Sequence, residues 1–130
     1  MKPSTSAKYA ILAVGYVAQH GKDGLIVSQA ISRDYDIPLE YLLKIMQELV
    51  KAGVLRSKRG PRGGFSLARS ISKITMLEII EAVEGPIDRS LALDQIVPKD
   101  KFGAKSTKAY DKVISQTKAA LKKIKLSDLL

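Results

Sequence analysis

The stretch Arg59-Gly60-Pro61-Arg62-Gly63-Gly64 most constrains the fold of this chain, because it cannot lie inside a helix or a central strand. Short runs typical of strands flank it at residues 54–58 and 64–68. Two such runs joined by a glycine-rich turn predict a β-hairpin. The tip of this hairpin carries two arginines and no acidic residue.

Most of the remaining chain is expected to be helical, because its apolar residues recur at three- and four-residue steps. This spacing predicts helices over about residues 5–20, 29–33, 38–51 and 106–125. Another helix begins at a capping box of Thr75 and Glu78 and ends at Gly85-Pro86. Residues 25–27 are apolar but too few for a helix, so we expect a short edge strand. The predicted fold class is mainly α with a small β-hairpin.

The helix predicted over residues 38–51 has two distinct faces. One face is apolar and consists of Leu39, Leu42, Ile45, Met46 and Leu49. The other face is polar and consists of Glu40, Lys44, Gln47 and Lys51. Pro38 fits the first turn, and Asp36 or Ile37 is the expected N-cap. A short helix, a turn and a second helix with a free polar face make a helix-turn-helix, and the hairpin that follows is its wing.

Positive charge is concentrated in two blocks of the chain. The net charge is +9 and the isoelectric point is near 9.8. No acidic residue lies between Glu48 and Glu78, an interval that contains Lys51, Arg56, Lys58, Arg59, Arg62, Arg69 and Lys73. The second block, residues 99–125, has nine lysines against Asp100 and Asp111. The first block predicts contact with duplex DNA, where arginines of the turn can enter a minor groove. The alternative is a turn that glycine merely permits, with solvated arginines.

A resemblance to the Rrf2 family of bacterial transcriptional regulators is carried by two segments, IPLEYLLKIMQELVKAGVLRSKRGPRGGFSLAR (37–69) and ITMLEIIEAVEGP (74–86). Its specific elements are Tyr41-Leu42, Arg59-Gly60-Pro61, Gly63-Gly64-Phe65 and Leu67-Ala68-Arg69. The family includes iron–sulfur and nitric-oxide sensors and a repressor of cysteine metabolism. The resemblance covers about residues 1–88. It implies a winged helix-turn-helix regulator of transcription, expected to be a repressor.

The resemblance assigns roles to several residues. It places Leu39, Glu40, Tyr41 and Lys44 at the start of the recognition helix. It makes Arg59 the wing arginine that enters the minor groove, and it sets Arg62 where the family usually has glycine. The added arginine would anchor a phosphate beside Lys58.

Residue chemistry suggests further DNA contacts. Glu40 can accept from the amino group of a cytosine, whereas Tyr41 and Lys44 can reach phosphate or base edges. For all three residues an ordinary solvated helix face is the alternative. Ser28 and Gln29, at the start of the helix before the turn, are expected to contact the DNA backbone, as are Lys2, Ser6 and Lys8.

The chain contains no cysteine. Family members that sense iron or nitric oxide hold a cluster on three cysteines in the linker after the Thr75 helix, and clusters need thiolates. The resemblance therefore implies a member without a cluster, and we expect no cofactor. Activity would be constitutive, or governed by a small molecule or a protein bound at the linker. The only histidine, His20, is expected to cap the end of its helix.

The last predicted helix has an apolar stripe, with Tyr110, Val113, Ile114, Thr117, Leu121 and Ile124 as the expected dimerisation residues. It lies outside the compact domain, so we expect it to bury this stripe on a second copy. The expected organisation is a DNA-binding domain (1–85), a linker (86–105) whose apolar residues pack on the domain or the partner, and a dimerisation helix with a tail (106–130). A two-fold dimer predicts a palindromic operator.

Several other classes of function fit the sequence less well. No arrangement of nucleophile, base or metal ligands indicates an enzyme. No apolar stretch is long enough for a membrane span and no leader is visible at the start, so we expect a cytoplasmic protein. The alternatives that remain are a non-specific basic nucleic-acid-binding protein and a winged-helix adaptor that binds another protein.

Overall fold

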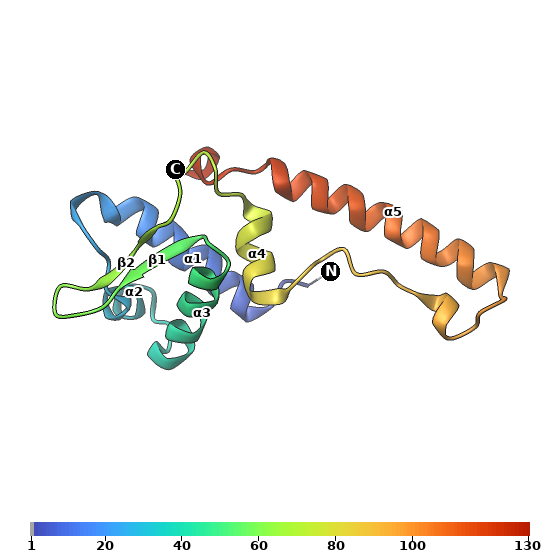
Figure 1. Ribbon diagram of the computed structural model, residues 1–130, viewed down its shortest axis with the longest axis horizontal. Coiled ribbons are helices and arrows are strands. Elements are labelled where there is room, and N and C mark those ends of the chain that lie inside the picture. The colour runs from blue at the N-terminus through green and yellow to red at the C-terminus, as the bar shows by residue number, and fades with distance from the viewer. Residues whose placement is uncertain (1) are drawn as a thin grey trace.

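The computed structural model describes residues 2–130 and contains five α-helices and one two-stranded antiparallel sheet (Figure 1). The helices are α1 (Thr5–His20), α2 (Ser28–Tyr35), α3 (Leu39–Lys51), α4 (Met76–Glu84) and α5 (Lys101–Lys123). The strands are β1 (Leu55–Lys58) and β2 (Gly64–Leu67). Short 3-10 helices complete the chain: η1 (Gly21–Asp23), η2 (Leu93–Gln95) and η3 (Leu126–Leu129). The predicted class, a winged helix-turn-helix with a long C-terminal helix, is confirmed.

Side-chain caps determine where α1 and α4 begin. The hydroxyl of Ser4 accepts a hydrogen bond from the N–H of Ala7 at 3.0 Å, so α1 starts where the sequence predicted. The predicted capping box is confirmed, because the N–H of Thr75 donates to Glu78 at 3.0 Å and the N–H of Glu78 donates to Thr75 Oγ1 at 3.2 Å.

The helix-turn-helix region differs from the prediction in its boundaries. Helix α2 extends to Tyr35 instead of ending near residue 33. The expected N-cap of α3 is wrong, because Pro38 occupies that position and no side chain caps the helix. Asp36 instead ends α2 in the left-handed conformation, with φ at 53°, and Ile37 is buried. A short polar side chain tolerates this conformation better than most residues do.

One apolar core holds the first three helices and α4 together. Helix α1 contributes mainly small residues, which let its neighbours approach closely. The core residues of α1, α2 and α3 are Ala10, Ala13, Val14, Tyr16, Val17, Ile31, Leu42, Ile45, Met46 and Leu49. The predicted apolar face of α3 is thus buried, except that Leu39 is only half-buried. The opposite face of α3 is left free.

The hairpin pairs β1 with β2 in antiparallel register, with Leu55 opposite Leu67 and Lys58 opposite Gly64. A third segment joins its edge. The N–H of Ile26 donates to the Phe65 carbonyl at 2.9 Å, and the N–H of Phe65 donates to the Ile26 carbonyl at 2.8 Å. The edge strand expected at residues 25–27 is therefore a single bridge, which ties the start of α2 to the root of the wing.

Helix α5 begins five residues earlier than predicted, at Lys101 instead of about residue 106. The carboxylate of Asp100 accepts the N–H of Gly103 at 2.8 Å, so Asp100 is the N-cap. Glycine within the first turn concealed this start from the sequence pattern. The expected linker of residues 86–105 is shortened accordingly.

The C-terminal tail packs into the core of the domain. Leu126 is 3% exposed and belongs to the central apolar cluster. Its N–H donates to the Ile74 carbonyl at 2.8 Å, and Thr75 forms a bridge with Lys125. The sequence placed α5 outside the compact domain, with nothing in its own chain to pack against. This expectation is wrong, because the tail fixes the C-terminal end of α5 to the domain.

Helix α5 and the linker form an arm that projects from the domain, with the linker running alongside the helix (Figure 1). Asp111 accepts from the hydroxyl of Ser90 at 2.7 Å and from the N–H of Leu91 at 3.1 Å. Lys118 donates to Asp88 at 3.0 Å, which raises the pKa of Lys118 and lowers that of Asp88. Within residues 2–130, no helix has the length and apolar character needed to cross a membrane.

Candidate DNA-binding surface

The turn between α2 and α3 is fixed by hydrogen bonds to Ser32. The hydroxyl of Ser32 donates to the Ile37 carbonyl at 2.6 Å, and the N–H of Ile37 donates to the Ser32 carbonyl at 3.1 Å. Ile31 and Ile37 are buried on either side of this turn. These contacts determine the angle at which α3 leaves α2.

The free face of α3 carries the polar residues that the sequence predicted. Glu40, Lys44, Gln47 and Lys51 are all exposed, and Glu40 lies in the first turn. A carboxylate is favourable at that end of a helix, so the position of Glu40 has a structural explanation that does not depend on DNA. The face presents donors and acceptors without a large apolar patch.

Tyr41 is more constrained than the sequence indicates. Its ring packs edge-on against Tyr9, with ring centres 5.5 Å apart, and its oxygen lies 2.6 Å from Ser6 Oγ. Its exposed fraction is 41%. Tyr41 therefore joins α3 to α1 while part of the residue stays accessible.

The wing projects from the domain as a loop (Figure 1). Arg59 and Arg62 are both exposed on it. Gly60 has φ at 108°, which favours glycine, and a Cβ on Gly63 would lie 2.2 Å from the Lys58 carbonyl oxygen. The two glycines let the chain turn tightly enough to present both arginines together.

A shallow groove of about 320 Å³ separates the start of α2 from the wing. Ser28 and Gln29 line one side, and Lys58, Gly60, Pro61 and residues 63–65 line the other. Ser28 is only 5% exposed, and its hydroxyl lies 3.4 Å from Gln29 Oε1. Ser28 and Gln29 were both predicted to contact the DNA backbone. Gln29 is accessible for such a contact, whereas Ser28 is buried and forms the floor of the groove.

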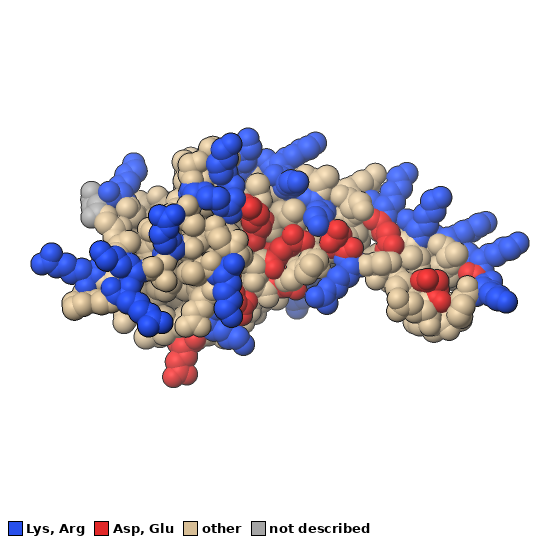
Figure 2. Space-filling model, in the orientation of Figure 1, with Lys and Arg blue, Asp and Glu red and all other residues tan. Residues whose placement is uncertain are grey.

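Basic side chains surround the hairpin end of the molecule, whereas acidic side chains gather over α4 and the linker (Figure 2). Arg69 is not part of this exposed basic surface, although it lies in the same block of positive charge in the sequence. Its guanidinium pairs with Glu78 at 3.0 Å and donates to the carbonyls of Gly53 and Lys73. Arg69 therefore fastens the end of the hairpin to α4.

A second polar link holds α2 against α1. The hydroxyl of Tyr16 donates to Asp34 at 2.6 Å, which raises the pKa of Tyr16. This bond and the neighbouring Arg33 lower the pKa of Asp34. His20, expected to cap the end of α1, lies with its ring against that of Tyr16 at 4.2 Å.

The predicted dimerisation residues divide between two faces of α5. Ile114 is only 5% exposed and lies on the face that packs on the linker and α4, so its assignment to the interface is a correction. Leu121 shares that face and is half-buried. Tyr110 and Val113, 40% and 58% exposed, remain available to a partner, with Thr117 beside them. The sequence pattern could not separate the two faces, because the residues of each face recur at three- and four-residue steps.

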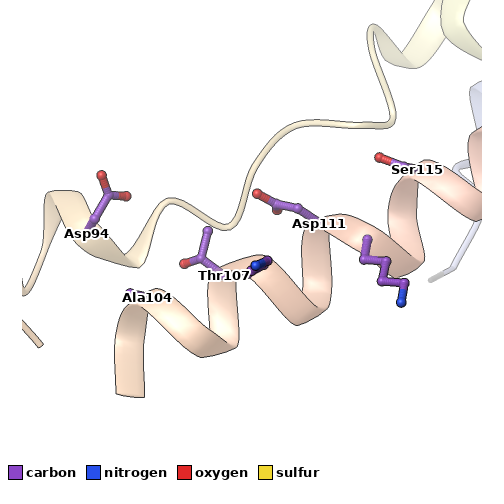
Figure 3. Close-up of a pocket in the computed structure, with 7 residues that line it drawn as sticks. Asp94, Ala104, Thr107, Asp111 and Ser115 are labelled. Carbon is purple, nitrogen blue, oxygen red and sulfur yellow. The ribbon is translucent and has the colours of Figure 1, made fainter. Parts of the chain in front are cut away.

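An open groove of about 680 Å³ lies between the linker and α5. Figure 3 displays Asp94 of η2 on one side and Thr107, Asp111 and Ser115 of α5 on the other. Lys108 and Lys112 also line it. Its lining mixes both charges, and part of Asp111 is already bonded to Ser90.

Comparison with known proteins decides the family of this chain. The Rrf2 family model, described as an iron-dependent transcriptional regulator, matches residues 3–130. The chain belongs to the Rrf2 family. Its sequence is 39% identical over 90 residues to the HTH-type transcriptional regulator IscR of Cereibacter sphaeroides, an alignment covering 68% of this chain and 58% of that protein. The chain spans between 51% and 60% of the length of the curated relatives it matches.

Solved Rrf2-type structures agree with the fold over nearly the whole chain. The structure of CymR (YrzC), the global cysteine regulator of B. subtilis, superposes with a TM-score of 0.82 at 27% identity, covering 99% of this chain and 95% of CymR. IscR of T. potens gives a TM-score of 0.73 at 28% identity, covering 99% of this chain and 85% of that one. The arm as well as the winged domain is therefore a shared feature.

The residues of this Rrf2 chain do not fit an iron–sulfur cluster. Such clusters are held chiefly by cysteine thiolates, and the sequence contains no cysteine. Within residues 2–130, no three histidine, cysteine, aspartate or glutamate residues are placed together to hold a metal ion. The carboxylate of Asp111 on α5 accepts hydrogen bonds from Ser90 and Leu91 of the linker.

Proposed function

We propose that this Rrf2 chain is a DNA-binding transcriptional repressor that acts as a homodimer on a palindromic operator. The observation that carries the proposal is the free polar face of α3 beside an arginine-tipped wing, on a domain whose other α3 face is buried. In this geometry α3 enters the major groove and Arg59 enters the adjacent minor groove. Arg62, Lys58 and Gln29 contact the phosphates between them.

Repression follows from occupancy, because a dimer seated on an operator covers DNA that RNA polymerase would use. Dimerisation is supported by the exposed apolar residues of α5, among them Tyr110 and Val113. We further propose that the chain works without an iron–sulfur cluster and without catalysis. Regulation would then come from a small molecule or a protein at the linker, where the groove of Figure 3 is available.

The test is a titration of two duplexes of equal length. One duplex carries the site selected by the protein from a random library, and the other carries the same bases in scrambled order. A specific repressor keeps a preference of about 10³ or more at physiological salt, because base contacts persist when phosphate contacts are screened. A protein that loses its preference would be a non-specific binder, and one with little affinity for either duplex would be an adaptor.

A further inference from the structure

One face of α5 carries a row of exposed lysines. The row consists of Lys101, Lys105, Lys108 and Lys112. Successive members are 4, 3 and 4 residues apart, so they lie on the same side of the helix. We call this row the lysine face. It is confined to the N-terminal half of α5, because the row continues with the uncharged residues Ser115, Gln116 and Ala119.

The lysine face destabilises the chain that carries it. Like charges three or four residues apart on a helix repel each other. Lys101 also lies at the start of α5, where the helix dipole disfavours positive charge and the first turn has no acidic residue. The only acidic residue of α5, Asp111, accepts its hydrogen bonds from the linker. Among the described side chains of α5, Lys118 is the only lysine in an ion pair. The charge of the lysine face is therefore not neutralised within the protein.

The acidic patch over α4 and the linker is already bonded within its own chain. Glu81 and Asp88 pair with Lys118 at 3.8 and 3.0 Å. Glu84 accepts the N–H of Ser4 at 2.9 Å. A second copy of the protein therefore offers little free acidic surface to the lysine face, and its complement has to come from another molecule.

The lysine face points away from the proposed DNA-binding surface. Helix α4 contacts both α3 and α5. The buried residues of α5, Gly103 and Ile114, lie on the side opposite the lysine face. In Figure 2, basic side chains fan outward from the arm toward the top and right of the view, whereas Figure 1 shows α3 at the lower left. A duplex that lies on α3 and the wing would therefore leave the lysine face uncovered.

We propose that the lysine face binds an acidic helix of a partner protein, with aspartate or glutamate at the same three- and four-residue steps. Lys101 and Lys112 are 11 residues apart, which corresponds to about 17 Å of helix. A partner helix with four carboxylates over this length matches each lysine with one acid. Ala104 and Ala109 flank the row and are exposed, so small side chains let the partner backbone approach.

The proposal gives a chemistry to the protein regulator suggested above. Lys108 and Lys112 also line the groove beside the linker, so a helix on the lysine face lies along the edge of that groove. The choice of a protein and not DNA as the acidic partner rests on the proposed function, which places the duplex on α3. Tyr110 and Val113 lie on another side of α5, so a homodimer built on them leaves the lysine face open.

Two variants that remove the same charge test the proposal. The lysine-face variant is Lys101→Gln/Lys105→Gln/Lys108→Gln/Lys112→Gln. The control variant changes four other exposed lysines and is Lys22→Gln/Lys73→Gln/Lys122→Gln/Lys123→Gln. Glutamine and lysine have similar helix propensities, so both variants should fold. The Tm of the lysine-face variant should exceed that of the control at low salt, because repulsion along α5 is removed. A Tm no higher than that of the control would remove the destabilisation on which the proposal depends.

The probe is a stapled, fluorescein-labelled helical peptide with four glutamates at the same steps of 4, 3 and 4 residues. A second peptide of equal composition carries its glutamates in one consecutive run. Binding is measured by fluorescence anisotropy at low and at physiological salt. The operator duplex and a duplex without the operator are titrated alongside.

The lysine-face variant should bind the patterned peptide about tenfold more weakly than the natural chain, since four exposed ion pairs of modest strength are lost. The control variant should stay within about threefold, and the natural chain should prefer the patterned peptide. Equal losses in the two variants, or equal affinity for the two peptides, would overturn the proposal in favour of general charge attraction. A larger loss of affinity for the duplex without operator in the lysine-face variant than in the control would overturn it in favour of a DNA surface. Failure of the natural chain to prefer its operator would instead overturn the proposed function, which the peptide titration does not test.

Discussion

The hydroxyl oxygens of Ser6 and Tyr41 lie 2.6 Å apart, which joins the first turn of α1 to the first turn of α3. A tyrosine hydroxyl has one proton and two acceptor positions, so this bond leaves Tyr41 able to bind a second group. The Tyr41 side chain, which positions α3, can therefore also contact DNA.

Substitution at both ends of this bond separates the two roles of Tyr41. Tyr41→Phe should lower operator affinity about tenfold, because a hydrogen bond to a charged phosphate is lost together with the link to Ser6. Ser6→Ala removes the link, together with the backbone contact expected of Ser6, but keeps the Tyr41 hydroxyl, and should change affinity by less than about threefold. Equal losses in the two variants, measured by fluorescence anisotropy, would mean that Tyr41 only positions α3.

Removal of the wing arginine, Arg59, should weaken DNA binding by an amount that depends on the base sequence flanking the operator. Arg59→Ala is expected to lower affinity roughly 10- to 100-fold on sites with A·T-rich flanks and less on G·C-rich flanks, because narrow A·T minor grooves attract arginine. Lys73→Ala removes the same charge from an exposed position outside the wing and is the matched control. If both variants lose affinity equally on both flanks, the wing supplies only long-range charge.

Arg69 should behave differently from the other arginines of its block, because its partners are within the protein. Arg69→Ala is expected to lower the free energy of unfolding by about 1–2 kcal/mol, the sum of a partly exposed ion pair and two carbonyl hydrogen bonds. Operator affinity at a temperature far below Tm should stay within about twofold. A large loss of affinity with unchanged Tm would instead place Arg69 on the DNA.

Arg59 and Arg69 illustrate what could and could not be predicted from the sequence. Helix periodicity, the Thr75 capping box and the glycine turn predicted the winged fold, because each is a local signal. One partner of Arg69, the Gly53 carbonyl, lies 16 residues away in the sequence, so counting charges along the chain could not show that Arg69 is held within the protein. The same limit applies to Leu126, whose place in the core depends on a long-range bridge between residues 75 and 125. Ile114 and Val113 were grouped for a related reason, because periodicity alone does not say which of two adjacent faces the chain itself covers.

The bond between Tyr16 and Asp34 predicts a pH dependence of stability. Because the pKa of Asp34 is lowered from its usual 3.8, the stabilisation is present above that value and is lost as the pH falls through the lowered pKa. The raised pKa of Tyr16 has the opposite consequence, since its contribution is present below pH 10.0 and is lost above it. Asp34→Asn should therefore have a lower Tm than the natural chain at pH 7, with a gap that narrows toward pH 3. A gap that stays constant from pH 7 to pH 3 would exclude the charge of Asp34 as its cause.

Introducing a charge on the exposed face of α5 should separate the two protomers. Val113→Asp is expected to abolish the dimer in sedimentation, because it puts a carboxylate on an apolar surface that pairing would take out of water. Val113 is 58% exposed in the single chain, so the variant should fold with nearly unchanged helicity. Operator affinity should fall by 10³ or more, far beyond the effect of one contact, because each protomer would bind one half-site alone. Ser115→Asp adds the same charge on the exposed opposite side of α5 and should leave both dimer and affinity intact; equal loss in the two variants would attribute the effect to charge and not to the interface.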